Sequence, residues 1–76
     1  HNERRYFEMK LSMKAARVEH GYTQETLAKK LGITKRTYIA WENGETEIKP
    51  YMIYALAYIF NMDADQIRVP VKKLER

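Results

Sequence analysis

The segment from Gln24 to Trp41 constrains the fold more than any other part of the chain. Spacings of three and four residues place side chains on one face of a helix, and a glycine tolerates the positive φ that a tight turn needs. The apolar and small residues of the segment are Leu27, Ala28, Leu31, Gly32, Ile33, Tyr38 and Trp41. This pattern predicts two short helices that meet at an angle across the glycine.

Capping residues predict where these two helices begin and end. Thr23 and Thr34 are suited to accept a hydrogen bond from the backbone N–H groups that open a helix. Gly32 and the Asn43–Gly44 pair tolerate a left-handed backbone, which ends many helices. We therefore predict one helix between Thr23 and Gly32 and a second over residues 34–43. Helices this short are unstable alone, so packing against the rest of the chain must hold them.

Three further helices are predicted around this pair. The first covers residues 9–20 and ends before Gly21. Pro50 opens another, because a proline loses no hydrogen bond at the first helical position. Asp63 caps a last short helix that reaches about Arg68. No segment alternates between apolar and polar residues as a strand does, so we predict an all-α, compact five-helix domain.

The composition indicates one small domain without catalytic groups. The 76 residues suffice for a single core, and with 45% hydrophobic and 32% charged residues the chain resembles neither a disordered tail nor a membrane span. The absence of cysteine excludes disulfides and suits a reducing cytoplasm, where we place the protein. His1 and His20 cannot form a metal site alone, and the carboxylates lack a neighbouring nucleophile or phosphate loop. We predict no enzyme activity, no cofactor, no metal and no small-molecule substrate.

The net charge favours a polyanionic partner without identifying it. Lysine and arginine number 14 against 10 aspartates and glutamates, which gives a formal charge of +4. Positive charge attracts nucleic acid, but many small proteins are equally basic for other reasons. Charge alone therefore leaves nucleic-acid binding open.

Three motifs stand at fixed distances from one another along the chain. They are the run from Ala16 to Ala28, the run Leu31-Gly32-Ile33-Thr34, and the run Trp41-Glu42-Asn43-Gly44. In this order and spacing they resemble the phage repressor and Cro family of helix-turn-helix domains, also called XRE-like. The resemblance covers roughly residues 9–68 and implies a lambda-repressor-like fold. It also implies a prokaryotic or phage transcriptional regulator, a repressor, that binds double-stranded operator DNA as a homodimer.

The resemblance assigns roles to individual residues. Contacts with bases are predicted at Thr34, Lys35, Arg36, Ile39 and Ala40. Contacts with phosphates are predicted at Thr23, Gln24, Asn43 and Lys49. Arg17 and Glu42 are predicted to form a structural ion pair. These assignments agree with chemistry, because lysine and arginine donate to guanine, alanine and isoleucine contact a thymine methyl, and a helix N-terminus binds anions.

Tyr38 departs from the family pattern. An aliphatic residue is usual at its position, so a buried tyrosine there needs a partner for its hydroxyl or a path to water. The loop that follows the second helix also differs, because Glu45 and Glu47 stand where relatives often carry basic residues. We therefore expect only Lys49 to contact phosphate from this loop.

The chain divides into three predicted parts. Residues 1–8 form an N-terminal extension or tag remnant, residues 9–68 the helix-turn-helix DNA-binding domain, and residues 69–76 a C-terminal tail or linker. An alternative function is that of a protein-interaction adapter or antitoxin with the same fold. Ile39 and Ala40 suit a protein partner, whereas Lys35 and Arg36 suit DNA.

Overall fold

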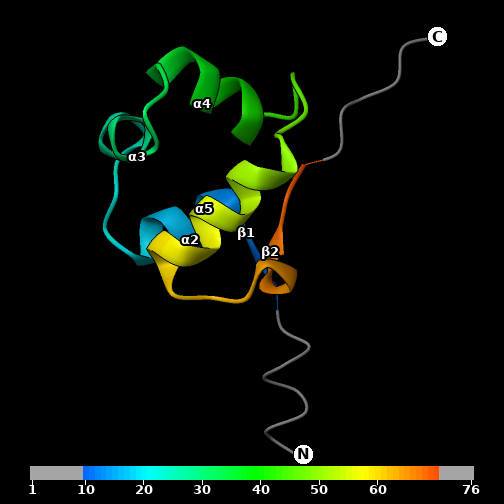
Figure 1. Ribbon diagram of the computed structural model, residues 1–76. Coiled ribbons are helices and arrows are strands. Elements are labelled where there is room, and N and C mark those ends of the chain that lie inside the picture. The colour runs from blue at the N-terminus through cyan, green and yellow to red at the C-terminus, as the bar shows by residue number, and fades with distance from the viewer. Residues whose placement is uncertain (1–9, 71–76) are drawn as a thin grey trace, which may run out of the picture.

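The computed structural model describes residues 10–70 as four α-helices, one short 3-10 helix and a pair of short strands (Figure 1). In chain order the elements are β1 (Leu11–Ser12), α2 (Met13–Glu19), α3 (Gln24–Leu31), α4 (Lys35–Glu42), α5 (Pro50–Phe60), η1 (Ala64–Gln66) and β2 (Ile67–Arg68). The largely helical fold agrees with the prediction. Within the described range, every helix is too short or too polar to reach across a lipid bilayer.

A pair of parallel strands takes the place of part of the predicted first helix. β1 pairs with β2, with Leu11 opposite Ile67. The Ser12 hydroxyl accepts a hydrogen bond of 3.0 Å from the N–H of Ala15 and so caps α2. The predicted start at Met9 lies outside the described residues. The helical class of the fold agrees with the prediction, but the expectation of no strands was wrong. Each strand has only two residues, which is too short for alternation to be visible in the sequence.

The predicted last helix, from Asp63 to about Arg68, is reduced to the single 3-10 turn η1. The N–H of Asp63 donates a hydrogen bond of 3.0 Å to the side-chain oxygen of Gln66, which closes this turn on itself. The chain then extends into β2, and the side chain of Ile67 is buried with only 6% exposed. Burial of this β-branched side chain against the core opposes a further helical turn, so the five predicted helices become four α-helices and one turn.

The central helices α3 and α4 lie where the sequence predicts them. The Thr23 hydroxyl accepts a hydrogen bond of 3.0 Å from the N–H of Thr26 at the start of α3. The Thr34 hydroxyl accepts one of 3.1 Å from the N–H of Thr37 at the start of α4. Pro50 occupies the first turn of α5, as predicted. Local capping chemistry therefore sets these three helix starts.

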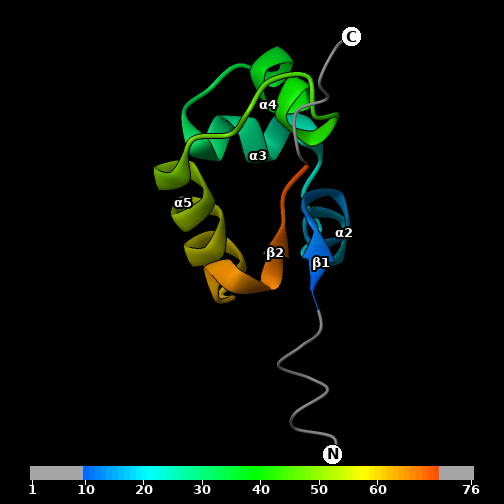
Figure 2. The same cartoon turned by 90° about the vertical axis from the view of Figure 1, so that its right-hand side faces the viewer.

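One hydrophobic core lies between the four helices. Its largest fully buried side chains are Tyr38, Phe60, Met13, Leu27 and Leu56. Of the larger apolar residues between Gln24 and Trp41, Leu27, Tyr38 and Trp41 are buried, whereas Leu31 and Ile33 are half-buried at the edge of the core. Figure 2 shows α3 and α4 at the top of the view, with α5 and α2 below them on opposite sides. The two short helices thus form one end of the molecule.

Candidate nucleic-acid interface

A left-handed glycine sets the angle between α3 and α4. Gly32 has φ 79° and ψ 28°, and its N–H points to the carbonyls that end α3. A Cβ at this position would meet no atom within 4 Å, so glycine is required by the backbone conformation and not by lack of space. The N–H of Ile33 donates to the carbonyl of Ala28 at 3.0 Å, and the Ile33 side chain packs against the core. As predicted, the chain therefore turns within a few residues and starts α4 directly.

The first turn of α4 carries two exposed cations. Lys35 and Arg36 follow the N-cap Thr34, and the turn contains no acidic residue. A helix N-terminus is the positive end of the helix dipole, where a carboxylate is stabilising by about 0.3–1 kcal/mol and a cation has the opposite effect. Lys35 and Arg36 therefore lower the stability of α4 at its N-terminus. An anionic ligand removes the penalty, so this turn is suited to bind one.

Glu42 joins α2, α3 and α4 in one hydrogen-bond network. Arg17 donates to it through Nε at 2.9 Å and through Nη2 at 3.4 Å. Gln24 Nε2 donates to Glu42 Oε1 at 3.0 Å, and the Tyr38 hydroxyl donates to Oε2 at 2.7 Å. Arg17 Nη1 also donates to the carbonyl of Tyr22 at 3.0 Å. The Arg17 and Glu42 side chains are only 11% and 5% exposed, so the network fixes the end of α4 against its neighbours.

The network changes the protonation properties of its members. Burial of Glu42 would raise the pKa of its carboxyl, but hydrogen bonds from Arg17, Tyr38 and Gln24 outweigh burial and leave this pKa below its ordinary value. Burial and the hydrogen bond to Glu42 raise the pKa of Tyr38. The hydrogen bond with Glu42 also raises the pKa of Arg17. The network is therefore stable with Arg17 positive, Glu42 negative and Tyr38 neutral.

We expect the Glu42 carboxylate to make folding stability depend on acid pH. A lowered folded-state pKa contributes stability that is complete above the unfolded pKa of about 4.3 and is lost as pH falls through the folded value. Thermal unfolding by circular dichroism between about pH 7 and pH 3 measures this loss. Glu42→Gln is expected to be less stable at neutral pH and to lose less on acidification than the wild type. Parallel pH profiles for the two proteins would contradict the assignment.

The fold and its glycine turn match a known family. A family model described as helix-turn-helix matches residues 13–67, from the start of α2 to the start of β2. The chain belongs to this XRE-like helix-turn-helix family. The matched residues include α3, the turn at Gly32 and α4, which carries the two exposed cations of its first turn.

Two relatives of this helix-turn-helix domain are similar to it over most of their length. An uncharacterized HTH-type transcriptional regulator of Methanocaldococcus jannaschii is 37% identical over 59 residues, which cover 78% of this chain and 89% of the relative. A second uncharacterized HTH-type transcriptional regulator, from Archaeoglobus fulgidus, is 34% identical over 53 residues, which cover 70% of this chain and 76% of the relative. The similarity therefore extends over the helices and not over one motif alone.

In the helix-turn-helix domain, the residues predicted to touch bases lie along α4 and its cap. Thr34, Lys35 and Arg36 are exposed, whereas Ile39 and Ala40 are half-buried. A hollow of about 580 Å³ lies between α4 and the loop that follows it. Its lining includes Arg36, Ala40 and also Lys49, which was predicted to contact phosphate. The fold thus brings residues from the two predicted sets to one surface.

The remaining residues predicted to touch phosphate lie at helix ends. Thr23 and Asn43 are exposed, at the N-cap of α3 and the C-cap of α4. Gln24 is half-buried, and one of its amide protons is engaged by Glu42, which leaves the second for another acceptor. The Thr23 hydroxyl proton is directed to Thr26 Oγ1 at 3.0 Å. A hydroxyl contact from Thr23 to DNA therefore requires its rotation away from Thr26.

The sequence analysis missed the partners of the two capping threonines. Thr26 Oγ1 accepts from the N–H of Thr23 at 2.9 Å, and Thr37 Oγ1 accepts from the Thr34 hydroxyl at 2.9 Å. The signal was present as threonine three residues after each cap, the spacing of a capping box. The partner of Tyr38 was also detectable, because Glu42 follows four residues later on the same helix.

Proposed function

We propose that this helix-turn-helix domain regulates transcription by binding double-stranded DNA, with α4 in the major groove. The cationic first turn of α4 carries the proposal. Positive side chains at a helix N-terminus destabilise an isolated helix, whereas a bound polyanion stabilises them. The major groove of B-DNA is wide enough to admit one α-helix. The names of the two relatives, HTH-type transcriptional regulators, support the same role for this chain.

Base contacts are assigned to the exposed first half of α4. Lys35 and Arg36 can donate to guanine O6 and N7, which predicts G·C pairs within the bound site. The Thr34 hydroxyl lies at the margin of this surface. Ala40 and Ile39, half-buried further along the helix, are suited to contact a thymine methyl. Specificity then depends mainly on two cationic side chains.

Phosphate contacts are assigned to groups at the helix ends. Thr23 and Gln24 stand at the start of α3, where free N–H groups favour an anion. Asn43 and Lys49 flank the loop between α4 and α5 and are both exposed. Contacts of this kind set the orientation of a protein on the duplex and carry no sequence information directly. They would hold α4 in register with the bases.

We propose that the protein acts as a homodimer on a palindromic operator. One α4 would enter each half-site, with centres about 10 base pairs apart. A dimer bound over a promoter excludes other proteins from that DNA without any catalytic step, so we propose a repressor. Such a regulator works where the DNA is, in the cytoplasm of a prokaryotic or phage-infected cell.

Selection of bound duplexes from a random pool tests the assignment of base contacts. The wild type is expected to enrich one half-site that contains guanine, and Lys35→Ala and Arg36→Ala are each expected to relax the preference at one position. A good bidentate contact provides about 1–3 kcal/mol of discrimination, or about 5- to 150-fold. Lys14→Ala, at an exposed position of α2, is the matched control. Unchanged base preferences in both α4 variants would show that the base contacts are wrongly assigned.

A further inference from the structure

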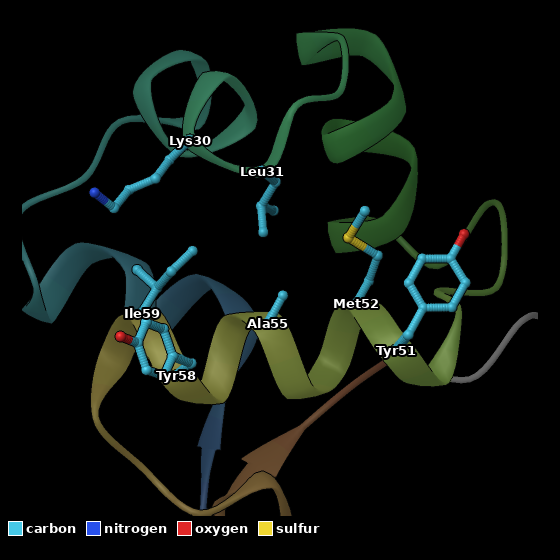
Figure 3. A pocket seen from close by; sticks show the side chains of 7 residues that line it. All are labelled: Lys30, Leu31, Tyr51, Met52, Ala55, Tyr58 and Ile59. Atoms are coloured by element: carbon cyan, nitrogen blue, oxygen red, sulfur yellow. The ribbon is translucent and has the colours of Figure 1, made fainter.

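The outward face of α5 carries a patch of exposed aromatic side chains. Tyr51, Tyr54 and Tyr58 are 66%, 67% and 88% exposed. Among residues 10–70 the other large hydrophobic side chain of comparable exposure is Val18 on α2, at 59%. A groove of about 540 Å³ runs beside the patch, between α5 and the end of α3. Figure 3 shows Lys30 of α3 on the opposite side of this groove from the α5 side chains.

The composition of α5 is typical of a helix that contacts protein on both faces. None of its eleven residues is charged, in a chain with 32% charged residues. Its inner face buries Leu56, Ala57 and Phe60 in the core. A helix that is apolar on all sides is normally surrounded by protein. The outer face therefore has the composition of an interface and not of a solvated surface.

The spacing on the outer face is that of a helix-pairing seam. Tyr51, Ala55 and Tyr58 follow one another at intervals of four and three residues within α5, the spacing at which one helix packs along another. Tyr51 and Tyr58 lie at equal distances from the centre of the seam, which falls between Tyr54 and Ala55. Because the same residue type stands at both ends of the seam, a second copy turned end to end presents tyrosine to tyrosine, as a two-fold symmetric interface requires.

We propose that α5 packs antiparallel against α5 of a second copy of this chain, across a two-fold axis near Ala55. In this arrangement Tyr51 of each copy meets Tyr58 of the other, and the small side chain of Ala55 lets the two backbones approach. Lys30, across the groove from Tyr58, can place its ammonium over the ring of the second copy's Tyr51. Each copy has a formal charge of +4, so an uncharged seam is where two copies approach with least repulsion.

The exposed area predicts a weak dimer in free solution. With about 200 Å² for a whole tyrosine, the three rings expose roughly 450 Å² on each copy, whereas a stable interface buries about 800 Å² per partner. DNA that holds two copies side by side raises their effective concentration and strengthens such a contact. Antiparallel pairing places the two α4 helices at opposite ends of the α5 pair. A dimer of this kind could span two half-sites of DNA. That role rests on the proposed DNA binding, whereas the pairing of the two α5 helices does not.

Sedimentation equilibrium without DNA, at up to about 500 µM protein, tests the pairing. The wild type is expected to dimerise, and Tyr58→Glu is expected to weaken association at least about tenfold, because it brings a charge into the apolar seam. Val18→Glu is the matched control, an equally exposed apolar position on another helix. Thermal unfolding of each variant verifies that the fold is intact. A monomeric wild type, or equal dimerisation of the two variants, would overturn the proposal.

A charge-swap pair tests the antiparallel register. In Tyr51→Glu/Tyr58→Lys, antiparallel packing places each new carboxylate beside the other copy's ammonium, and dimers are expected. In Tyr51→Glu/Tyr58→Glu the same packing opposes like charges, and monomers are expected. Equal association of the two double variants would refute the register. Binding of a single half-site duplex, measured in parallel, separates the two proposals: a wild type that dimerises but binds no duplex contradicts the DNA-binding function alone.

Discussion

Glu42→Ala is expected to remove a large share of the free energy of unfolding of the protein. The substitution leaves the Arg17 guanidinium buried without its counter-charge, and such a loss costs about 3–5 kcal/mol. It also removes the acceptor of the Tyr38 hydroxyl, in a side chain that is fully buried. Native domains of this size are stable by only about 4–10 kcal/mol in total. Urea unfolding followed by circular dichroism measures the difference.

Two further proteins separate the network from general effects of the substitution. Glu45→Ala removes an exposed carboxylate three residues away and is expected to change stability by less than about 0.5 kcal/mol. Arg17→Met combined with Glu42→Leu is expected to recover part of the loss, because no buried charge is left unpaired. If Glu42→Ala were as stable as Glu45→Ala, the network could not be what holds α4 in place.

The affinity for duplex DNA is expected to fall on the order of a thousandfold between about 50 and 200 mM salt. Each copy brings Lys35, Arg36 and Lys49 to the duplex as exposed cations. A cation that contacts a base in the groove also neutralises a nearby phosphate, so a dimer neutralises up to about six phosphates. Each neutralised phosphate adds about −0.9 to the slope of log affinity against log salt, which gives a slope near −5. Fluorescence anisotropy titrations at several salt concentrations measure it.

The same titrations discriminate DNA binding from the alternative of a protein-interaction adapter. A protein partner held by apolar contacts is expected to respond weakly to salt. Lys49→Gln removes one phosphate contact per copy and is expected to reduce the slope for DNA by about 2. Lys14→Gln, on α2, leaves the slope unchanged if α4 and its loop form the interface. A wild-type slope near zero would remove the phosphate contacts from the proposed function.

The helices α3 and α4 could be predicted from the sequence because local chemistry specifies them. Thr23 and Thr34 each cap the helix that follows, and Gly32 adopts the left-handed conformation that α3 needs to end. These signals act over three or four residues and do not depend on the rest of the chain. The bounds of both helices and the turn between them follow from these signals, whereas the family was identified from the resemblance of three motifs along the chain.

The strand pair and the extent of the Glu42 network could not be predicted in the same way, because both depend on residues far apart in the sequence. β1 has no strand pattern of its own and forms only because β2 lies beside it. Gln24 was assigned to phosphate from the resemblance alone, whereas the structure also joins it to Glu42 across two helices. The base and phosphate contacts stay predictions, since their partner is DNA.

The pairing of β1 with β2 links the first element of the described fold to its last. A strand needs a neighbour for its backbone hydrogen bonds, and the residue of β2 that lies opposite Leu11 is Ile67, a buried member of the core. Contacts between segments so far apart in the sequence carry a cost in loop-closure entropy. The strand pair therefore joins the start of α2 to the segment that follows α5, so removal of the residues of either strand is expected to release the other strand, and with it Ile67, from the core.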